Sequence, residues 1–275
     1  MNDLIRMAKA DISESLRARW FIVYTIVFGT IMVGLLVSGL TESRIMGFTG
    51  LSRLLVTYIQ ITMAILPIFM LITTVRSVVG DREAGIYEYL LSLPVKLSAW
   101  YWGKLIGRFV VVFLPVMLAM FIAVFWGIIK GVTIPWSQVL LYTGLLASMI
   151  TSFLGIGMLI STLSKSTDVA QGAAFIVWLF LLLFLDLILL GAMIREGIQA
   201  ETAVTIALMN PLQSFRTAAM LLFDPQLVLL GPSAFVILDL FGRLGYLIWA
   251  LVYPLSVGLL AAWMGYWGFQ KGDLS

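Results

Sequence analysis

The feature that most constrains this chain is a series of uncharged, apolar runs long enough to cross a membrane. A helix needs about 20 apolar residues to span about 30 Å of hydrocarbon, and runs of that size recur along the 275 residues. They predict an all-α membrane protein with six transmembrane helices. The predicted spans are 20–40, 54–75, 109–129, 136–163, 169–194 and 244–270.

The composition excludes several classes of protein. Hydrophobic residues make up 61% of the chain and charged residues 11%, against about 45–50% and about 25% in an average soluble domain. With a mean hydropathy of +1.07, a soluble globular fold, a disordered chain and a nucleic-acid-binding protein are excluded. The chain has neither Cys nor His, so it lacks thiol chemistry, the commonest metal ligand and the commonest general base. An enzyme is therefore disfavoured.

The stretch 195–243 allows two interpretations. It carries seven charged residues around a very apolar middle, and it could hold two further spans. Arg216 would then lie deep in hydrocarbon, which is costly, and Asn210-Pro211 and Gly231-Pro232 would interrupt both spans. We therefore expect short helices that lie in, or dip into, the outer interface.

The distribution of Lys and Arg predicts the orientation, because these residues are enriched in cytoplasmic loops. An even number of spans puts both termini on one side, and eleven basic residues fall on that side against six on the other. Both termini are therefore expected in the cytoplasm. The eleven are Arg6, Lys9, Arg17, Arg19, Arg76, Arg82, Lys96, Lys104, Arg108, Lys165 and Lys271, and the six are Arg44, Arg53, Lys130, Arg195, Arg216 and Arg243.

Residues 1–19 do not resemble a cleavable signal, because their charges extend to the edge of the first span. On a helical wheel one face carries an apolar stripe. This predicts an amphipathic helix in the plane of the headgroups, the alternative being an ordinary charged leader. The stripe comprises Leu4, Ile5, Ala8, Ile12 and Leu16.

Few residues suggest chemistry inside the chain. No phosphate-binding GxxxxGK[ST] loop or GxSxG motif occurs, and the methionines are dispersed, so no metal site is predicted. Asp186 is the ionisable residue clearly inside a predicted span, either as a functional group or as a structural acid bonded to a neighbouring helix. Small residues one turn apart, Gly103/Gly107 and Gly157/Ser161, would allow helices to approach closely.

The cytoplasmic segment 80–104 differs from a plain linker. Asp81 can cap a short helix, Glu83 would fall in its first turn, and Pro94 would end it, which predicts a helix over about 82–93. Such a helix would either dock in the groove of a soluble partner or pack against the spans of its own chain. Its apolar residues are Ile86, Leu90 and Leu93, and its acids are Glu83 and Glu88.

The same segment resembles the cytoplasmic loop of ABC-2-type permeases, the membrane subunits of ATP-driven ABC assemblies. The shared order is acid, Gly, acid, Leu-Leu, Pro and Gly-Lys, here Glu83, Gly85, Glu88, Leu90-Leu91, Pro94 and Gly103-Lys104. The resemblance implies two paired permease copies above two cytoplasmic ATPase subunits, which bind the ATP and Mg²⁺, with no cofactor and no catalysis in this chain. It implies that coupling to the ATPase involves Asp81, Glu83, Gly85, Glu88, Leu91 and Pro94.

Within that family the chain is most similar to permeases that support copper-site maturation of nitrous oxide reductase. The similarity lies around Asp186, Met209-Asn210-Pro211, Phe215-Arg216 and the tail 271–274. It implies a bacterial inner-membrane location and a periplasmic subunit resting on the outer segment. The residues implied to contact that subunit are Asn210, Pro211, Phe215 and Arg216.

Three alternatives stay open. A related ABC-2 permease could export a lipid, a glycan or a drug, and genes for a periplasmic repeat protein and copper proteins nearby would argue against it. A secondary transporter acting alone usually carries several intramembrane ionisable residues and internal repeats. A membrane-embedded enzyme is the third.

Overall fold

The computed structural model describes residues 2–19, 21–27, 29–30, 50–86, 95–129, 136–195, 197–223 and 233–272. Within these ranges the protein is built from helices joined by short turns, without a strand. An all-α architecture is therefore confirmed. The helices described over their full length are α1 (Asn2–Arg17), α3 (Gly50–Thr74), α4 (Arg76–Glu83), α6 (Leu97–Ile129), α7 (Trp136–Leu163), α8 (Thr167–Leu179), the π-helix η1 (Phe180–Phe184), α9 (Leu185–Ile194), α10 (Ala200–Leu208), α11 (Pro211–Phe223) and α12 (Ser233–Gly272).

Five segments of the described chain are long and apolar enough to cross a membrane. They correspond to the second to sixth predicted spans, and α7 has the predicted bounds. The predicted first span, 20–40, lies mostly outside the described residues, so six spans stay a prediction. The five segments are Thr62–Glu83, Leu97–Ile122, Trp136–Leu163, Thr167–Ala192 and Val236–Lys271.

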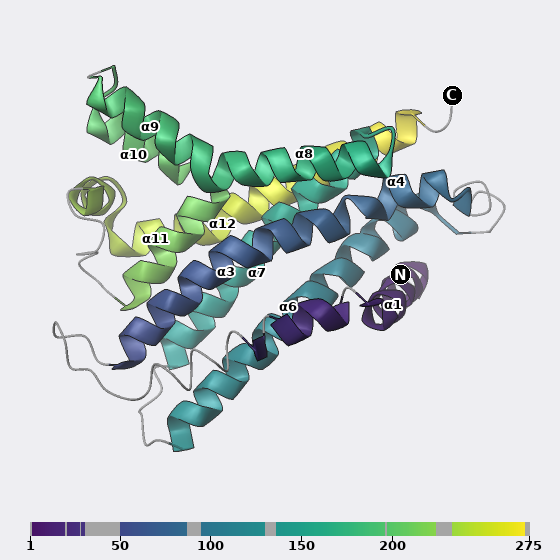
Figure 1. Cartoon of the computed structure of the whole chain (residues 1–275), viewed down its shortest axis with the longest axis horizontal. Coiled ribbons are helices and arrows are strands. Elements are labelled where there is room, and N and C mark those ends of the chain that lie inside the picture. The colour runs from purple at the N-terminus through teal and green to yellow at the C-terminus, as the bar shows by residue number, and fades with distance from the viewer. Residues whose placement is uncertain are drawn as a thin grey trace.

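The long helix α7 occupies the middle of the bundle (Figure 1) and contacts α3, α4, α6, α8, α11 and α12. Its most extensive contact is with α12. The backbones meet at Gly155 and Gly258, because a Cβ built on Gly155 would lie 1.9 Å from the carbonyl oxygen of Gly258. The side chains of α7 around this crossing are buried; they are Leu146, Met149, Ile150, Phe153 and Leu154.

The span formed by α8, η1 and α9 lies on the outside of the bundle (Figure 1). Most of its large apolar side chains are exposed, which suits a surface facing lipid or another protein rather than water. They include Phe175, Ile176, Phe180, Leu183, Phe184, Leu187, Ile188 and Leu190.

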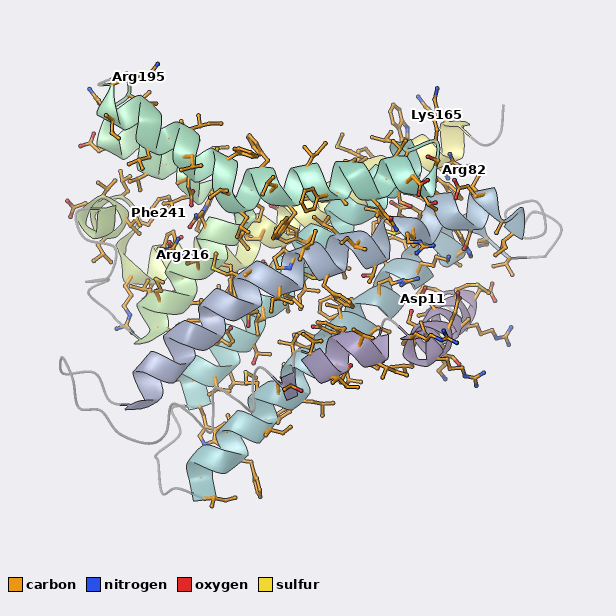
Figure 2. All side chains as sticks on the ribbon, in the orientation of Figure 1. Asp11, Arg82, Lys165, Arg195, Arg216 and Phe241 are labelled. Atoms are coloured by element: carbon orange, nitrogen blue, oxygen red, sulfur yellow. The ribbon has the colours of Figure 1, made fainter. Side chains whose placement is uncertain are left out.

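The bundle has two chemically different ends. Figure 1 places α1, α4 and both ends of the chain at one end, and α9, α10 and α11 at the other. Arg82 and Lys165, expected on the inner side, lie at the first end, and Arg195 and Arg216, expected on the outer side, lie toward the second (Figure 2). The loops assigned to the two sides therefore lie at opposite ends of the bundle, and the cytoplasmic position of the first end stays a prediction.

Two short helices, α10 with 9 residues and α11 with 13, follow the α9 span. At about 1.5 Å per residue neither can cross about 30 Å of hydrocarbon, so neither is a further span, and residues 224–232 lie outside the described part of the chain. The last span then follows a kink at Gly242, whose φ of 64° is readily adopted by glycine.

Candidate functional site

The candidate site is the charged end, defined here as α1, α4 and the first turns of α6 and α8. Figure 2 shows Asp11, Arg82 and Lys165 there, on three different segments. Four polar contacts hold these segments to one another, and each joins residues far apart in the sequence.

The first contact ties α6 to α4. Lys104 Nζ donates hydrogen bonds to the carboxylate of Asp81 and to the carbonyl oxygen of Ser77, the latter at 2.8 Å. It also lies 4.8 Å from the ring centroid of Trp100. Lys104 is buried, and a buried ammonium group is stable only when paired in this way. The Gly-Lys motif therefore has a structural partner in Asp81.

The second contact ties α4 to α8. Glu83 Oε1 accepts a hydrogen bond from the backbone N–H of Thr167 at 3.0 Å, and the Ser166 hydroxyl accepts from Val169 N–H at 3.3 Å. A carboxylate is favourable at this position because the first N–H groups of a helix have no partner within it. Glu83 is therefore a cap for the fifth predicted span.

These contacts correct only the start of the predicted helix over 82–93, because residues 87–93 lie outside the described part of the chain. Asp81 and Glu83 belong to the last turn of α4 rather than to the start of a new helix. The helix ends because Gly85 has a φ of 68°, a conformation that side chains disfavour. The remaining predicted coupling residues, Glu88, Leu91 and Pro94, lie outside the described residues.

The third contact places α4 against the end of α7. The Arg82 guanidinium lies 3.4 Å and 3.5 Å from the carbonyl oxygens of Thr162 and Ser164, where a positive charge is favourable at a helix C-terminus. One turn earlier, Ser161 Oγ accepts hydrogen bonds from two backbone N–H groups of α4. Close approach at the predicted pair Gly157/Ser161 is confirmed, since Gly157 packs against Thr74.

The fourth contact docks α1 on α6. Cβ atoms built at Gly103 and Gly107 would lie 2.6 Å from the Cβ of Met7 and 2.7 Å from the carboxylate of Asp11. The close approach predicted for this glycine pair is therefore confirmed. Asp11 Oδ1 lies 3.3 Å from Arg108 Nε. Burial raises the pKa of the Asp11 carboxyl, although Arg108 and then Lys104 act to lower it.

Sequence reasoning missed Asp11 because it considered only the apolar stripe of this helix. The side of α1 that packs on α6 carries Ala8, Asp11 and Ser15, whereas Ile5 and Leu16 are 46% and 39% exposed. The apolar stripe is thus only partly turned away from the protein, at Ile5 and Leu16, and its contact with lipid stays a prediction. Ala8, Asp11 and Ser15 are three and four residues apart, which places them on one face of a helix. This spacing of small and polar residues is the pattern from which the packing face could have been predicted.

The opposite end of the bundle holds the predicted outer residues, but it buries most of them. Asn210 and Phe215 are 2% and 0% exposed, Pro211 is also buried, and Arg216 is half-buried. These three residues pack within the chain because α11 inserts between the spans, and their contact with an extracytoplasmic partner stays a prediction. Arg216 keeps partial access to the surface.

Asp186 has a polar partner within the chain. Its carboxylate accepts a hydrogen bond from Gln213 Nε2, and Gln213 Oε1 lies 3.5 Å from Arg216 Nη1. A carboxylate next to apolar side chains is stable when hydrogen-bonded in this way. The interpretation as a structural acid bonded to a neighbouring helix is favoured.

Comparisons with known proteins find ABC-type permeases similar to most of the chain. A family model described as "ABC-2 family transporter protein" matches residues 5–274. The "Probable ABC transporter permease protein NosY" of Stutzerimonas stutzeri is 26% identical over 229 residues, which cover 78% of this chain and 80% of that protein. The protein of the same name from Pseudomonas aeruginosa is 22% identical over 227 residues, covering 79% and 82%.

Proposed function

Since the chain belongs to the ABC-2 family of transporter proteins, we propose that it is the membrane permease subunit of a complex that includes a separate cytoplasmic ATPase. It is a multi-pass membrane protein, and the proposal assigns ATP and Mg²⁺ to the partner. The charged end is the docking surface for that partner. One observation carries this assignment: α4 is hydrogen-bonded to α6, α7 and α8. A movement of α4 caused by a bound partner would therefore be transmitted to the three spans that contain these helices.

The finer assignment follows the similarity to the two NosY permeases. In this proposal two copies of the chain pair in the bacterial inner membrane, with both termini in the cytoplasm. A NosF-like ATPase dimer binds below, and a NosD-like periplasmic subunit rests above. The complex then supports assembly of the copper site of nitrous oxide reductase.

The chain itself transmits movement in this proposal and conducts no hydrophilic cargo. The ionisable groups that reach into its apolar segments have partners in the protein: Lys104 is bonded to Asp81 and Asp186 to Gln213. Groups engaged in this way are poorly placed to coordinate a polar substrate. Movement of packed helices between two arrangements is an established way to pass a signal across a protein.

Charge reversal at the docking surface tests the proposal. The double variant Glu83→Lys, Glu88→Lys would put positive charge where a carboxylate now caps α8 and where the family resemblance places a partner contact. Mismatched charge at an interface typically costs about 2–5 kcal/mol, so co-purification of the ATPase should fall at least about tenfold. The measurement is the amount of ATPase retained with the affinity-purified permease from membranes.

Glu201→Lys is the matched control, because Glu201 is also an exposed carboxylate at a helix end, here the first turn of α10 at the opposite end of the bundle. This variant should retain the ATPase. If the double variant also retains the ATPase and its hydrolysis of ATP, the charged end is not the docking surface.

A second experiment separates the copper role from export of another cargo. Cells lacking this chain should make nitrous oxide reductase without its copper. Replacing Met46, Met193, Met209 and Met220 with Leu, which nearly preserves volume, should leave copper incorporation intact. Normal incorporation in the deletion strain would favour an exporter of lipid, glycan or drug, and loss in the Met variant would show that the chain handles copper.

A further inference from the structure

The outer span of the bundle, α8–η1–α9, is bonded to other elements at both of its ends. At the charged end, Glu83 of α4 caps its first turn through Thr167 N–H. Toward the other end, Gln213 of α11 is bonded to Asp186. Between those ends α8 packs on α3, α4 and α7, whereas few contacts other than those with α10 hold η1 and α9 against the rest of the bundle.

Between the two ends lies a wide turn, the π-helix η1 (Phe180–Phe184). The N–H of Leu185 donates to the carbonyl oxygen of Phe180, five residues back, and not to that of Leu181, four residues back. Such turns are frequent at functional sites in helices. In hydrocarbon the carbonyl of Leu181 needs another donor.

Asn210 supplies that donor from the corner before α11. Its Nδ2 donates to the carbonyl oxygen of Leu181 at 2.6 Å, and its Oδ1 accepts from the N–H of Leu212 at 3.0 Å. One buried amide thus caps α11 and holds the wide turn of the neighbouring span. The corner is also tied to α12, because the hydroxyl of Tyr253 donates to the carbonyl oxygen of Met209 at 2.6 Å.

We propose that Asn210 is a positioning residue that keeps η1 in its π form, and that the α8–η1–α9 span carries movement from α4 to α10 and α11. The inference rests on the proposed function, since it names the element through which coupling passes. A π-turn contains one residue more than an α-turn. Rewinding it would rotate the flanking segments relative to each other by about 100° and shift them by about 1.5 Å, the values for one helical residue.

The test uses the complex purified with its ATPase and reconstituted in lipid. The chain has no Cys, so a single Cys at the exposed Thr202 of α10 can carry an environment-sensitive fluorophore. ATP with Mg²⁺ should change its fluorescence in the wild-type complex. Asn210→Ser keeps an oxygen to cap α11 but cannot reach Leu181, and its fluorescence change should be at least about fivefold smaller, the lower end of typical coupling between sites.

A matched variant and a second perturbation keep the result unambiguous. Tyr253→Phe removes the other hydrogen bond to the same corner, and it should preserve the fluorescence change. Deleting Leu182 converts η1 to an α-turn while the faces on both sides keep their register, and it should reduce the change as Asn210→Ser does. Hydrolysis of ATP by the complex should continue in all of these variants.

The outcomes distinguish this inference from the proposed function. A normal fluorescence change in Asn210→Ser, or in the Leu182 deletion if Asn210→Ser does not fold, overturns the role of the π-turn while the proposed function stands. Equal losses in Asn210→Ser and Tyr253→Phe overturn it as well, because the corner would then matter only for stability. A wild-type complex that shows no ATP-dependent change overturns both.

Discussion

Replacing Gly155 with alanine tests the crossing of α7 and α12, on which the bundle is built. The new Cβ would lie 1.9 Å from the carbonyl oxygen of Gly258, 2.6 Å from its carbonyl carbon and 2.8 Å from its Cα. All three are backbone atoms, which cannot rotate aside as a side chain can. Since ordinary contacts begin near 3.4 Å, the helices must move apart locally by about 1.5 Å to restore normal packing.

That separation is large on the scale of dispersion forces. A gap of about 0.5–1 Å already forfeits about a quarter to a half of the attraction between facing atoms, and overpacking a core typically costs about 1–3 kcal/mol. The α7–α12 contact is the most extensive among the described helices. We therefore expect Gly155→Ala to lower the free energy of unfolding by about 3 kcal/mol.

Thermal unfolding of the purified protein in detergent, followed by size-exclusion chromatography, measures the effect. A loss of about 3 kcal/mol should lower the midpoint by about 5–10 °C. Gly172→Ala in α8 is the control, because nothing lies within 4 Å of the position that its Cβ would take, and alanine is the better helix former by about 1 kcal/mol. Equal midpoints for the two variants would refute the close crossing.

Three further predictions concern topology and the charged end. In intact spheroplasts an impermeant thiol reagent should label a Cys at Thr202 but not at Lys165, and the reverse pattern would invert the orientation. Gly107→Leu should release α1, seen as faster hydrogen exchange of its amides, since a Cβ there already meets Asp11; unchanged protection would contradict the docking. Lys104→Met should destabilise the protein by about 2 kcal/mol because Asp81 loses its partner, and adding Asp81→Leu should recover much of this loss; a double variant no more stable than the single one would argue against the pair.

The position of α6 shows where sequence reasoning reached its limit. The span was expected to begin after Arg108, at 109, because charges usually mark the edge of the hydrocarbon. The helix begins at Leu97 instead. It continues through both charges because Lys104 is bonded to Asp81 and Arg108 is paired with Asp11. Neither acid lies near these residues in the sequence.

The sequence predicted the candidate site only in part, because the contacts of the site also join residues far apart in the sequence. The motif from Glu83 to Lys104 pointed to the charged end of the bundle, since charge and helix signals are local. The pairing of Asp81 with Lys104 and the capping of α8 by Glu83 were not predicted, because each depends on a helix that arrives from elsewhere in the chain. Asp11 was missed altogether.

The sequence alone determined that this is a helical membrane protein, where most of its spans lie and which loops share a side. Hydrocarbon imposes these features on each segment separately, because most backbone groups must bond within their own helix and side chains must be apolar over about 20 residues. Tertiary structure decided the burial of α11, the π-turn held by Asn210 and the partners of the charged groups. These depend on which helices meet, and a polar group near hydrocarbon takes whatever partner that meeting provides.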